Sequence, residues 1–185
     1  MRYYLRPKSL FVAGLLLLGV FLLSIKAEAE SSESIAPEWA ISEWINSEGF
    51  TLSDMRGKVV IIDFFQLWCP GCNKFSGPLM KKWSQKYSSR TDIQFVAIHT
   101  VFEGHSQQTP KILRQYVKEK KITYPVGVDN QVSGQRLPET MIRYNTRGTP
   151  EMAIIDKNGN IRFQHFGSFN PDVVEKLIDT LLKEE

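Results

Sequence analysis

Runs of apolar residues divide the chain into candidate strands. "KVVIIDFFQL", residues 58–67, and "DIQFVAIHT", residues 92–100, are apolar at almost every position. Strands buried on both faces have this composition, because both sets of alternating side chains face a core. A shorter run at residues 124–129 predicts a third strand. The pattern therefore indicates a sheet whose central strands are covered on both sides.

Between these strands the apolar residues recur at helical spacing. Residues 72–87 predict a helix that contains Pro78 and is therefore kinked. A Thr-Pro pair, with the threonine as a cap, predicts the start of a second helix over residues 109–121. Residues 138–145 predict a short third helix.

The last helix has a clear start signal. Asn170 is a capping residue, and Pro171 suits the first helical position. Its buried face is expected to consist of Val173, Val174, Leu177, Ile178, Leu181 and Leu182.

Two stretches predict β-hairpins. Residues 151–167 alternate around Asn158-Gly159, a pair that favours a type I′ turn. Residues 37–58 contain shorter alternating stretches around Gly49 and predict an N-terminal hairpin. The order of the predicted elements indicates an α/β fold, with a mixed sheet and helices on both faces.

The first 29 residues form a different kind of segment. Three basic residues are followed by an uncharged apolar run, residues 9–25, and then by "AEA" at residues 27–29. This is the pattern of a signal peptide, with cleavage expected after Ala29. The run is also nearly long enough to remain as an N-terminal membrane anchor. Both interpretations place the rest of the chain outside the cytoplasm.

Charge and composition define the remaining parts of the chain. The formal net charge of +3 comes from the first 29 residues, since the rest contains 19 basic and 19 acidic residues. A neutral domain gives no reason to expect nucleic acid as a partner. Residues 30–37 are small, polar and acidic and predict a flexible linker. Residues 38–185 are then expected to form one domain.

Both cysteines lie in "WCPGC", residues 68–72, directly after the first buried strand. A structural zinc site usually needs four ligands, and none of His99, His105 and His165 lies at a paired spacing. A purely structural disulfide across so short a loop would constrain little of the unfolded chain. A redox-active pair is the third interpretation, and the placement of the two thiols favours it.

This placement gives a redox role a physical basis. Cys69 stands where the strand ends and a helix begins, so the first N–H groups and the helix dipole stabilise its thiolate. The thiolate is the nucleophile in disulfide exchange. Cys72 lies one helical turn further along, where it can attack Cys69 and resolve a mixed disulfide.

Three stretches resemble one family. "VIIDFFQLWCPGC" resembles the active-site strand and loop of thioredoxins. "GFTLSDMRGKVVIIDFF" and "YNTRGTPEMAIIDKNGNI" resemble the lead-in and cis-proline segments of exported, membrane-associated thioredoxin-like proteins of the TlpA/ResA type. The resemblance covers roughly residues 36–185. It implies a thioredoxin fold with an inserted helix-strand unit and the activity of a thiol–disulfide oxidoreductase.

The resemblance also implies roles for single residues. Cys69 matches the attacking cysteine, Cys72 the resolving one, and Asp63 the buried acid behind them. The positions that match a substrate-binding surface are Trp68, Pro70, Thr149 and Pro150. A cis bond is expected between the last two, which would leave the backbone of Thr149 free to pair with an extended substrate peptide.

The sequence departs from TlpA/ResA-type proteins at three positions. Phe75 stands where these proteins often have Glu, and Asp63 where they often have Asn. Pro78 lies one residue later than their helix proline. The buried acid is therefore expected on the strand instead of the helix, and the substrates of these relatives are a weaker guide.

Two other functions occur on this fold. A thiol peroxidase of the peroxiredoxin type would need Pro and Thr where this chain has Ile62 and Gln66. A copper-binding module could use the soft thiolates together with a histidine. Copper carriers of this fold have a motif that resembles C-x-x-x-C with a distal histidine instead. Titration of the reduced protein with Cu(I) would distinguish a copper-binding module from an oxidoreductase.

We therefore predict an exported thiol–disulfide oxidoreductase that exchanges a Cys69–Cys72 dithiol or disulfide with protein substrates and acts as a reductant. An upstream thiol electron donor at the inner membrane is the expected second partner. No organic cofactor or metal is implied. The expected location is the periplasm or another extracytoplasmic compartment, with residues 9–25 as a possible membrane anchor.

Overall fold

The computed structural model describes residues 34–184, and within them seven strands form one mixed sheet. Their order across the sheet is β1-β7-β6-β3-β4-β5-β2. The three adjacent strands β3, β4 and β5 are parallel, and the other pairs are antiparallel. The strands are β1 Ser34–Ile35, β2 Ile41–Ile45, β3 Val59–Phe65, β4 Ile93–His99, β5 Val126–Asp129, β6 Glu151–Ile155 and β7 Asn160–Phe166.

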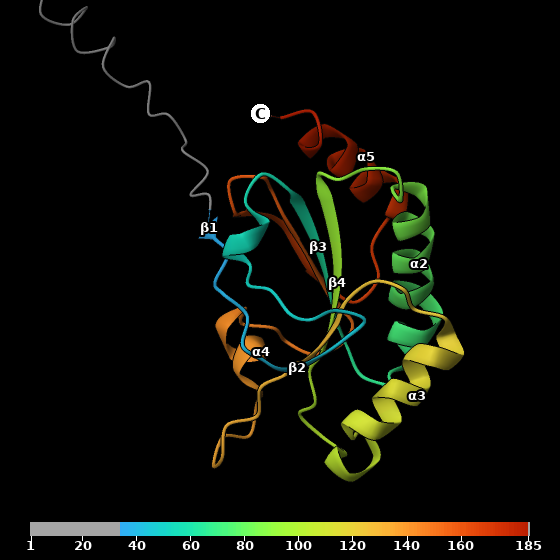
Figure 1. Cartoon of the computed structure of the whole chain (residues 1–185), viewed down its shortest axis with the longest axis vertical. Helices are drawn as coiled ribbons and strands as arrows, with labels where there is room; N and C mark the ends of the chain where they lie inside the picture. Colours follow the sequence, from blue (N-terminus) through green and yellow to red (C-terminus); the bar gives the residue numbers. More distant parts are fainter. Residues whose placement is uncertain (1–33, 185) are drawn as a thin grey trace, which may run out of the picture. The chain divides into compact units, whose positions relative to one another are not determined.

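Helices cover both faces of this sheet, as predicted (Figure 1). The α-helices are α2 Gly77–Lys86, α3 Pro110–Lys120, α4 Glu139–Arg143 and α5 Pro171–Leu181. Helices α2, α3 and α5 contribute to the core on one face, while Tyr144 at the end of α4 belongs to the core on the other. Short 3-10 helices lie at Ser53–Met55 and His105–Gln107.

The central strand β3 explains the apolar run in the sequence. All seven of its residues are buried. Val59, Ile61 and Phe65 face the core under α2, α3 and α5, whereas Val60, Ile62 and Phe64 face the opposite core. Two-sided burial of this kind needs apolar side chains at nearly every position. Asp63 shares the parity of Ile61 and Phe65 and is the exception on that face.

The predicted helix-strand insertion is present. Helix α3 and strand β5 follow β4, and β5 extends the sheet by pairing in parallel with β4. Thr109 caps α3 by accepting the N–H of Ile112, and Pro110 is its first residue. These local signals were sufficient to place this helix from the sequence alone.

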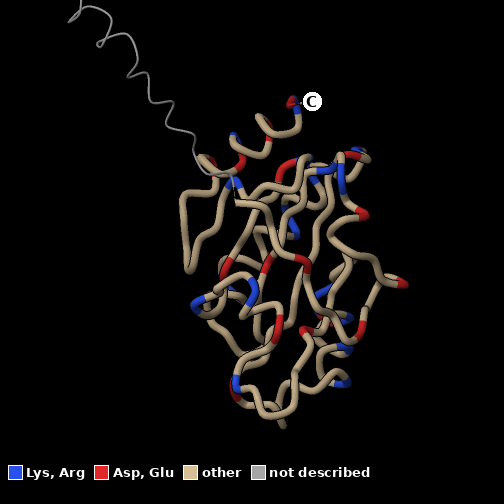
Figure 2. Tube along the Cα trace, turned by 90° about the vertical axis from the view of Figure 1, so that its left-hand side faces the viewer, with Lys and Arg blue, Asp and Glu red and all other residues tan. Residues whose placement is uncertain are grey.

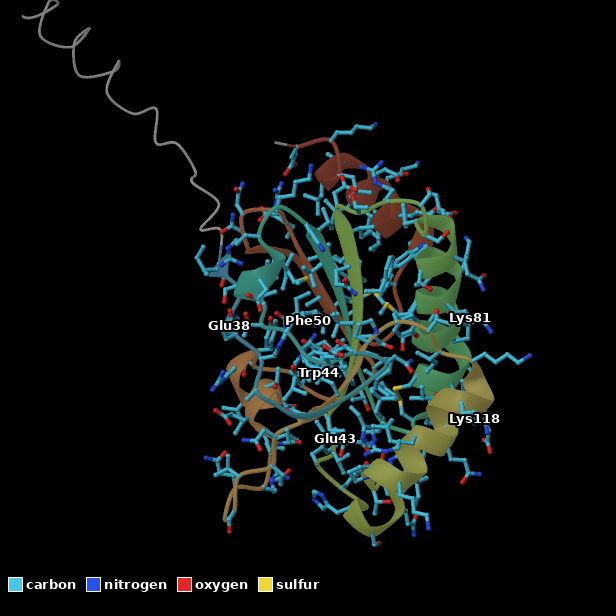
Figure 3. All side chains as sticks on the ribbon, in the orientation of Figure 1. Glu38, Glu43, Trp44, Phe50, Lys81 and Lys118 are labelled. Carbon is cyan, nitrogen blue, oxygen red and sulfur yellow. A yellow bond between two sulfur atoms is a disulfide. The ribbon has the colours of Figure 1, made fainter. Side chains whose placement is uncertain are left out.

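The predicted N-terminal hairpin is wrong. Strand β1 pairs with β7, while β2 pairs with β5 at the opposite edge of the sheet. The aromatic residues Trp39, Trp44 and Phe50 pack on one another and close one core. Trp44 and Phe50 are labelled in Figure 3. The two N-terminal strands thus form the two edges of the sheet, and their long-range pairing, which leaves no local signal, replaces the expected turn around Gly49.

The boundaries of the linker and of the last helix also need correction. Ser34–Ile35 pairs with β7 and Ala36 is buried, so the domain includes residues that we assigned to the linker. Val173 is 61% exposed, although Val174, Ile178, Leu181 and Leu182 are buried as predicted. An apolar residue at the edge of a helical stripe can face solvent at little cost.

The β6–β7 hairpin is present, but its turn differs from the predicted type I′. Only Gly159 has a positive φ, at 90°. Its N–H donates to the Asp156 carbonyl at 3.0 Å. Three residues therefore form the loop, with glycine in the left-handed position, as in a type I turn followed by a bulge.

No helix within residues 34–184 is long and apolar enough to cross a membrane. The apolar run at residues 9–25 and the expected cleavage site lie outside the described residues. Figure 2 shows basic and acidic residues interspersed along the described trace.

Candidate active site

The strand β3 and the helix that follows it place the two cysteines. Cys69 and Cys72 form a disulfide with a Cα–Cα distance of 5.2 Å. The N–H of Cys72 donates to Cys69 Sγ at 3.1 Å. Cys69 is 7% exposed and Cys72 2% exposed, so the cysteine predicted to attack is the more accessible residue.

A π-helical turn, Cys72–Ser76, connects the cysteine loop to α2. The N–H of Gly77 donates to the Cys72 carbonyl, five residues back. Pro78 has no N–H for the regular α-helical ladder, which gives the wider turn a local cause. A Cβ at Gly77 would lie 2.9 Å from the Cys72 oxygen, so this turn requires glycine. The kink predicted at Pro78 thus takes the form of a π turn at the resolving cysteine.

The peptide bond between Thr149 and Pro150 is cis, as predicted. The ring of Pro150 lies against the cysteine loop, since a Cβ at Gly71 would be 2.8 Å from Pro150 Cδ and 4.0 Å from Cys69 Sγ. The fold therefore brings together two segments that are about 80 residues apart in the sequence.

Asp63 lies behind the cysteines in a nearly water-free environment. Its side chain is 3% exposed, and Ser76 Oγ donates to its Oδ2 at 3.1 Å. Its Oδ1 has no hydrogen-bond partner within residues 34–184. Burial raises the pKa of Asp63 to about 7, against the opposing hydrogen bond from Ser76. A carboxyl with this pKa can accept or release a proton near neutral pH.

A cleft of about 220 Å³ opens beside Cys72 between α2 and the segment from α3 to β5. Its lining includes Tyr116 and Tyr124, and Lys81 stands on the α2 side (Figure 3). The charge of Asp63 contributes to the raised pKa of both tyrosines, although burial is the larger cause. The acid and the resolving cysteine therefore border the same region of the interior.

Asn73 holds the backbone of the loop that leads into Cys69, a role that the sequence did not reveal. Its Nδ2 donates to the carbonyls of Leu67 at 2.8 Å and Cys69 at 3.0 Å. The hydroxyl of Tyr116 donates in turn to Asn73 Oδ1 at 3.1 Å. The available signal was an asparagine directly after Cys72. Its role depends on the contact with Tyr116 of α3, which the sequence alone does not indicate.

The other predicted residues differ in their surroundings. Trp68 is 44% exposed, and Pro70 is exposed beside Cys69. Phe75 packs edge-on against Phe169 at 5.1 Å, where TlpA/ResA-type proteins often have an acid. His99 is buried, and burial lowers its pKa to about 4, so it stays neutral at physiological pH.

The histidines lie apart from the cysteines in the sequence, and within residues 34–184 no three His, Cys, Asp or Glu side chains form a metal-binding group. Ile62 and Gln66, which stand in the peroxiredoxin signature positions, are both buried.

Residues 33–164 match the AhpC/TSA family. The chain belongs to the AhpC/TSA family. The ResA thiol-disulfide oxidoreductase of Geobacillus kaustophilus is 26% identical over 149 residues, which cover 80% of this chain and 76% of that protein. Protein DipZ of Mycobacterium tuberculosis is 29% identical over 161 residues, or 85% of this chain. The chain spans only 22% of the length of DipZ.

Solved structures agree with this assignment. A thioredoxin-like superfamily protein superposes with a TM-score of 0.78 and 41% identity, over 82% of this chain and 98% of that protein. A thiol-disulfide isomerase from Corynebacterium glutamicum gives a TM-score of 0.76 and 38% identity, over 81% and 98%. The AhpC/TSA-family chain therefore has the thioredoxin fold, and it is similar to proteins named as thiol–disulfide oxidoreductases and isomerases.

Proposed function

We propose that the chain is an exported oxidoreductase that reduces disulfides in protein substrates with the Cys69–Cys72 dithiol. The observation that carries this proposal is the position of Cys69 Sγ. Cys69 is the more exposed of the two cysteines, its sulfur accepts one backbone N–H, and the cis-proline segment lies beside it. An extended polypeptide can approach this sulfur along the backbone of Thr149.

Exchange proceeds in two steps in which sulfur replaces sulfur. The Cys69 thiolate attacks one sulfur of the substrate disulfide, a bond to Cys69 forms, and the other substrate sulfur leaves as a thiolate. Cys72 then loses its proton and attacks Cys69 Sγ. The second substrate thiolate leaves, and the Cys69–Cys72 disulfide forms. Two electrons pass from the dithiol to the substrate, and a donor dithiol must later return them.

Asp63 is proposed as the base of the second step. Its carboxyl is buried beneath the π turn that begins at Cys72, and burial places its pKa near neutrality. A group with this pKa can take the Cys72 proton as the thiolate forms. Trp68, Pro70, Thr149 and Pro150 are proposed as the surface that receives the substrate.

The surroundings of Cys69 support a reductant. Strong oxidants depend on a strongly stabilised nucleophilic thiolate, because this destabilises the disulfide relative to the dithiol. Pro70 has no N–H and Gly71 no side chain, and the N–H of Cys72 is the contact that stabilises Cys69 Sγ. Such limited stabilisation favours a potential near that of thioredoxin.

Thiol labelling of intact cells tests export and direction together. A membrane-impermeant maleimide should label the full chain in cells or spheroplasts before lysis, because the dithiol would face outward and be kept reduced by an inner-membrane donor. A Cys69→Ala/Cys72→Ala double variant is the background control. Labelling only after lysis would contradict export, and labelling only after added reductant would contradict a reductant role.

A further inference from the structure

Two glutamine side chains form a buried amide pair beside the active-site loop. Gln66 directly follows β3 and Gln108 precedes α3, and both are buried. Gln108 Nε2 donates to Gln66 Oε1 at 2.8 Å and to the Glu103 carbonyl at 2.9 Å. Gln108 Oε1 accepts the N–H of Leu67 at 2.9 Å. The pair thus joins the loop before α3 to the backbone that leads into the cysteines.

The same pair holds Trp68. The indole Nε1 donates to Gln66 Oε1 at 2.8 Å, so one oxygen accepts from two side chains. The indole ring lies on Gly104, where a Cβ would be 1.8 Å from Trp68 Cη2. Gly104 also has a φ of 62°, which favours glycine. The ring is therefore held at Nε1 and contacts Gly104 with its six-membered ring, while Trp68 stays 44% exposed.

A groove of about 290 Å³ lies between Trp68 and α3. Ile112, on its α3 side, is 40% exposed and forms part of an apolar wall. The groove is lined by Leu67, Trp68, Gln107, Gln108, Ile112, Gln115, Tyr116 and Glu119. Glu119 accepts a hydrogen bond from Gln115, which places its carboxylate among the polar residues of this lining.

The position and lining of this groove indicate what it receives. It begins one residue before Cys69, so a polypeptide bound covalently to Cys69 passes its edge. Exposed Trp68 and Ile112 gain free energy when they bury an apolar side chain. An acidic side chain would instead meet the carboxylate of Glu119. The lining therefore favours an apolar residue next to the substrate cysteine.

We propose that the Trp68–Ile112 groove is a specificity subsite for an apolar substrate side chain, and that Gln66 and Gln108 are the positioning residues that form it. This inference rests on the proposed exchange with protein substrates. Its residues bind and orient the substrate, whereas the cysteines carry out the exchange. Changes to the subsite should therefore alter the selection of substrates, measured as KM.

Two synthetic peptides test the subsite. They carry the same intramolecular disulfide and differ by Leu or Ser next to the first cysteine. The full chain, recycled with dithiothreitol, should show a KM about fivefold lower for the Leu peptide. Ile112→Ser, Gln66→Leu and Gln108→Leu should each remove this preference by raising KM for the Leu peptide, so that the loss appears in KM and not in kcat.

Val173→Ser is the matched control, because it removes an exposed apolar side chain from α5, at the opposite end of the domain from α3 (Figure 1). Equal KM values for the two peptides, or a preference that survives in Ile112→Ser, would overturn the subsite. Ile112 is a surface residue, so its variant gives a result even where a buried glutamine variant fails to fold. A protein that oxidises the dithiol peptides but reduces neither disulfide would refute the reductant role, and the same Leu-to-Ser comparison would then test the groove.

Discussion

Cys69→Ala is expected to abolish the reduction of disulfides, because the nucleophile of the first step is lost. Cys72→Ala should instead accumulate a mixed disulfide between Cys69 and the substrate, since attack remains possible and resolution does not. Non-reducing electrophoresis and mass spectrometry of both variants, each incubated in reduced form with a disulfide peptide, measure the two outcomes. Serine in place of Cys72 is the control for loss of packing, because this buried position tolerates few changes of volume.

The roles of the two cysteines would be reversed if Cys69→Ala formed the stable adduct. The assignment of these roles would also be wrong if Cys72 were alkylated faster than Cys69 at neutral pH. The greater exposure of Cys69 and the N–H at its sulfur both oppose that result.

Asp63→Asn should slow turnover by about 100-fold, within the range for loss of a general base, mainly at the resolving step. The variant should also stabilise the fold. The folded-state pKa of about 7 lies above the unfolded value of about 3.8, so the folded state binds the extra proton between these values. The stability of the wild type therefore falls as pH rises through this window. At pH 8 the variant should be more stable by up to about 4 kcal/mol.

Urea unfolding of wild type and Asp63→Asn at pH 4, 6 and 8 measures this difference. Ser76→Ala is the matched variant, because it removes the hydrogen bond that opposes the raised pKa of Asp63. Its pH–rate profile should shift to higher pH than that of the wild type. Unchanged turnover of Asp63→Asn between pH 6 and 9 would leave Asp63 as a core residue without a catalytic role.

Much of the fold was predictable because its signals are local. A few adjacent residues are enough to indicate each of three features: the two-sided burial of β3, the Thr-Pro start of α3 and the Asn-Pro start of α5. The cysteine loop and the cis-proline segment were predictable through resemblance to a family. The N-terminal strands were not, since β1 and β2 pair with distant strands at opposite edges of the sheet.

The site was predictable only where a residue carries its chemistry by itself. Cys69, Cys72 and Asp63 have reactive groups at informative positions. Asn73 and Gln108 are ordinary amides whose roles depend on partners brought together by folding. Their hydrogen bonds cross from the cysteine loop to its neighbours, and no spacing in the sequence indicates such contacts.

The reduction potential of the Cys69–Cys72 pair tests the central claim most directly. The full chain, equilibrated in glutathione buffers of defined composition, can be quenched with acid and its free thiols counted. Limited stabilisation of the Cys69 thiolate predicts a potential near thioredoxin's, about −270 mV. A potential above about −150 mV, close to that of strong oxidants, would contradict the assignment as a reductant.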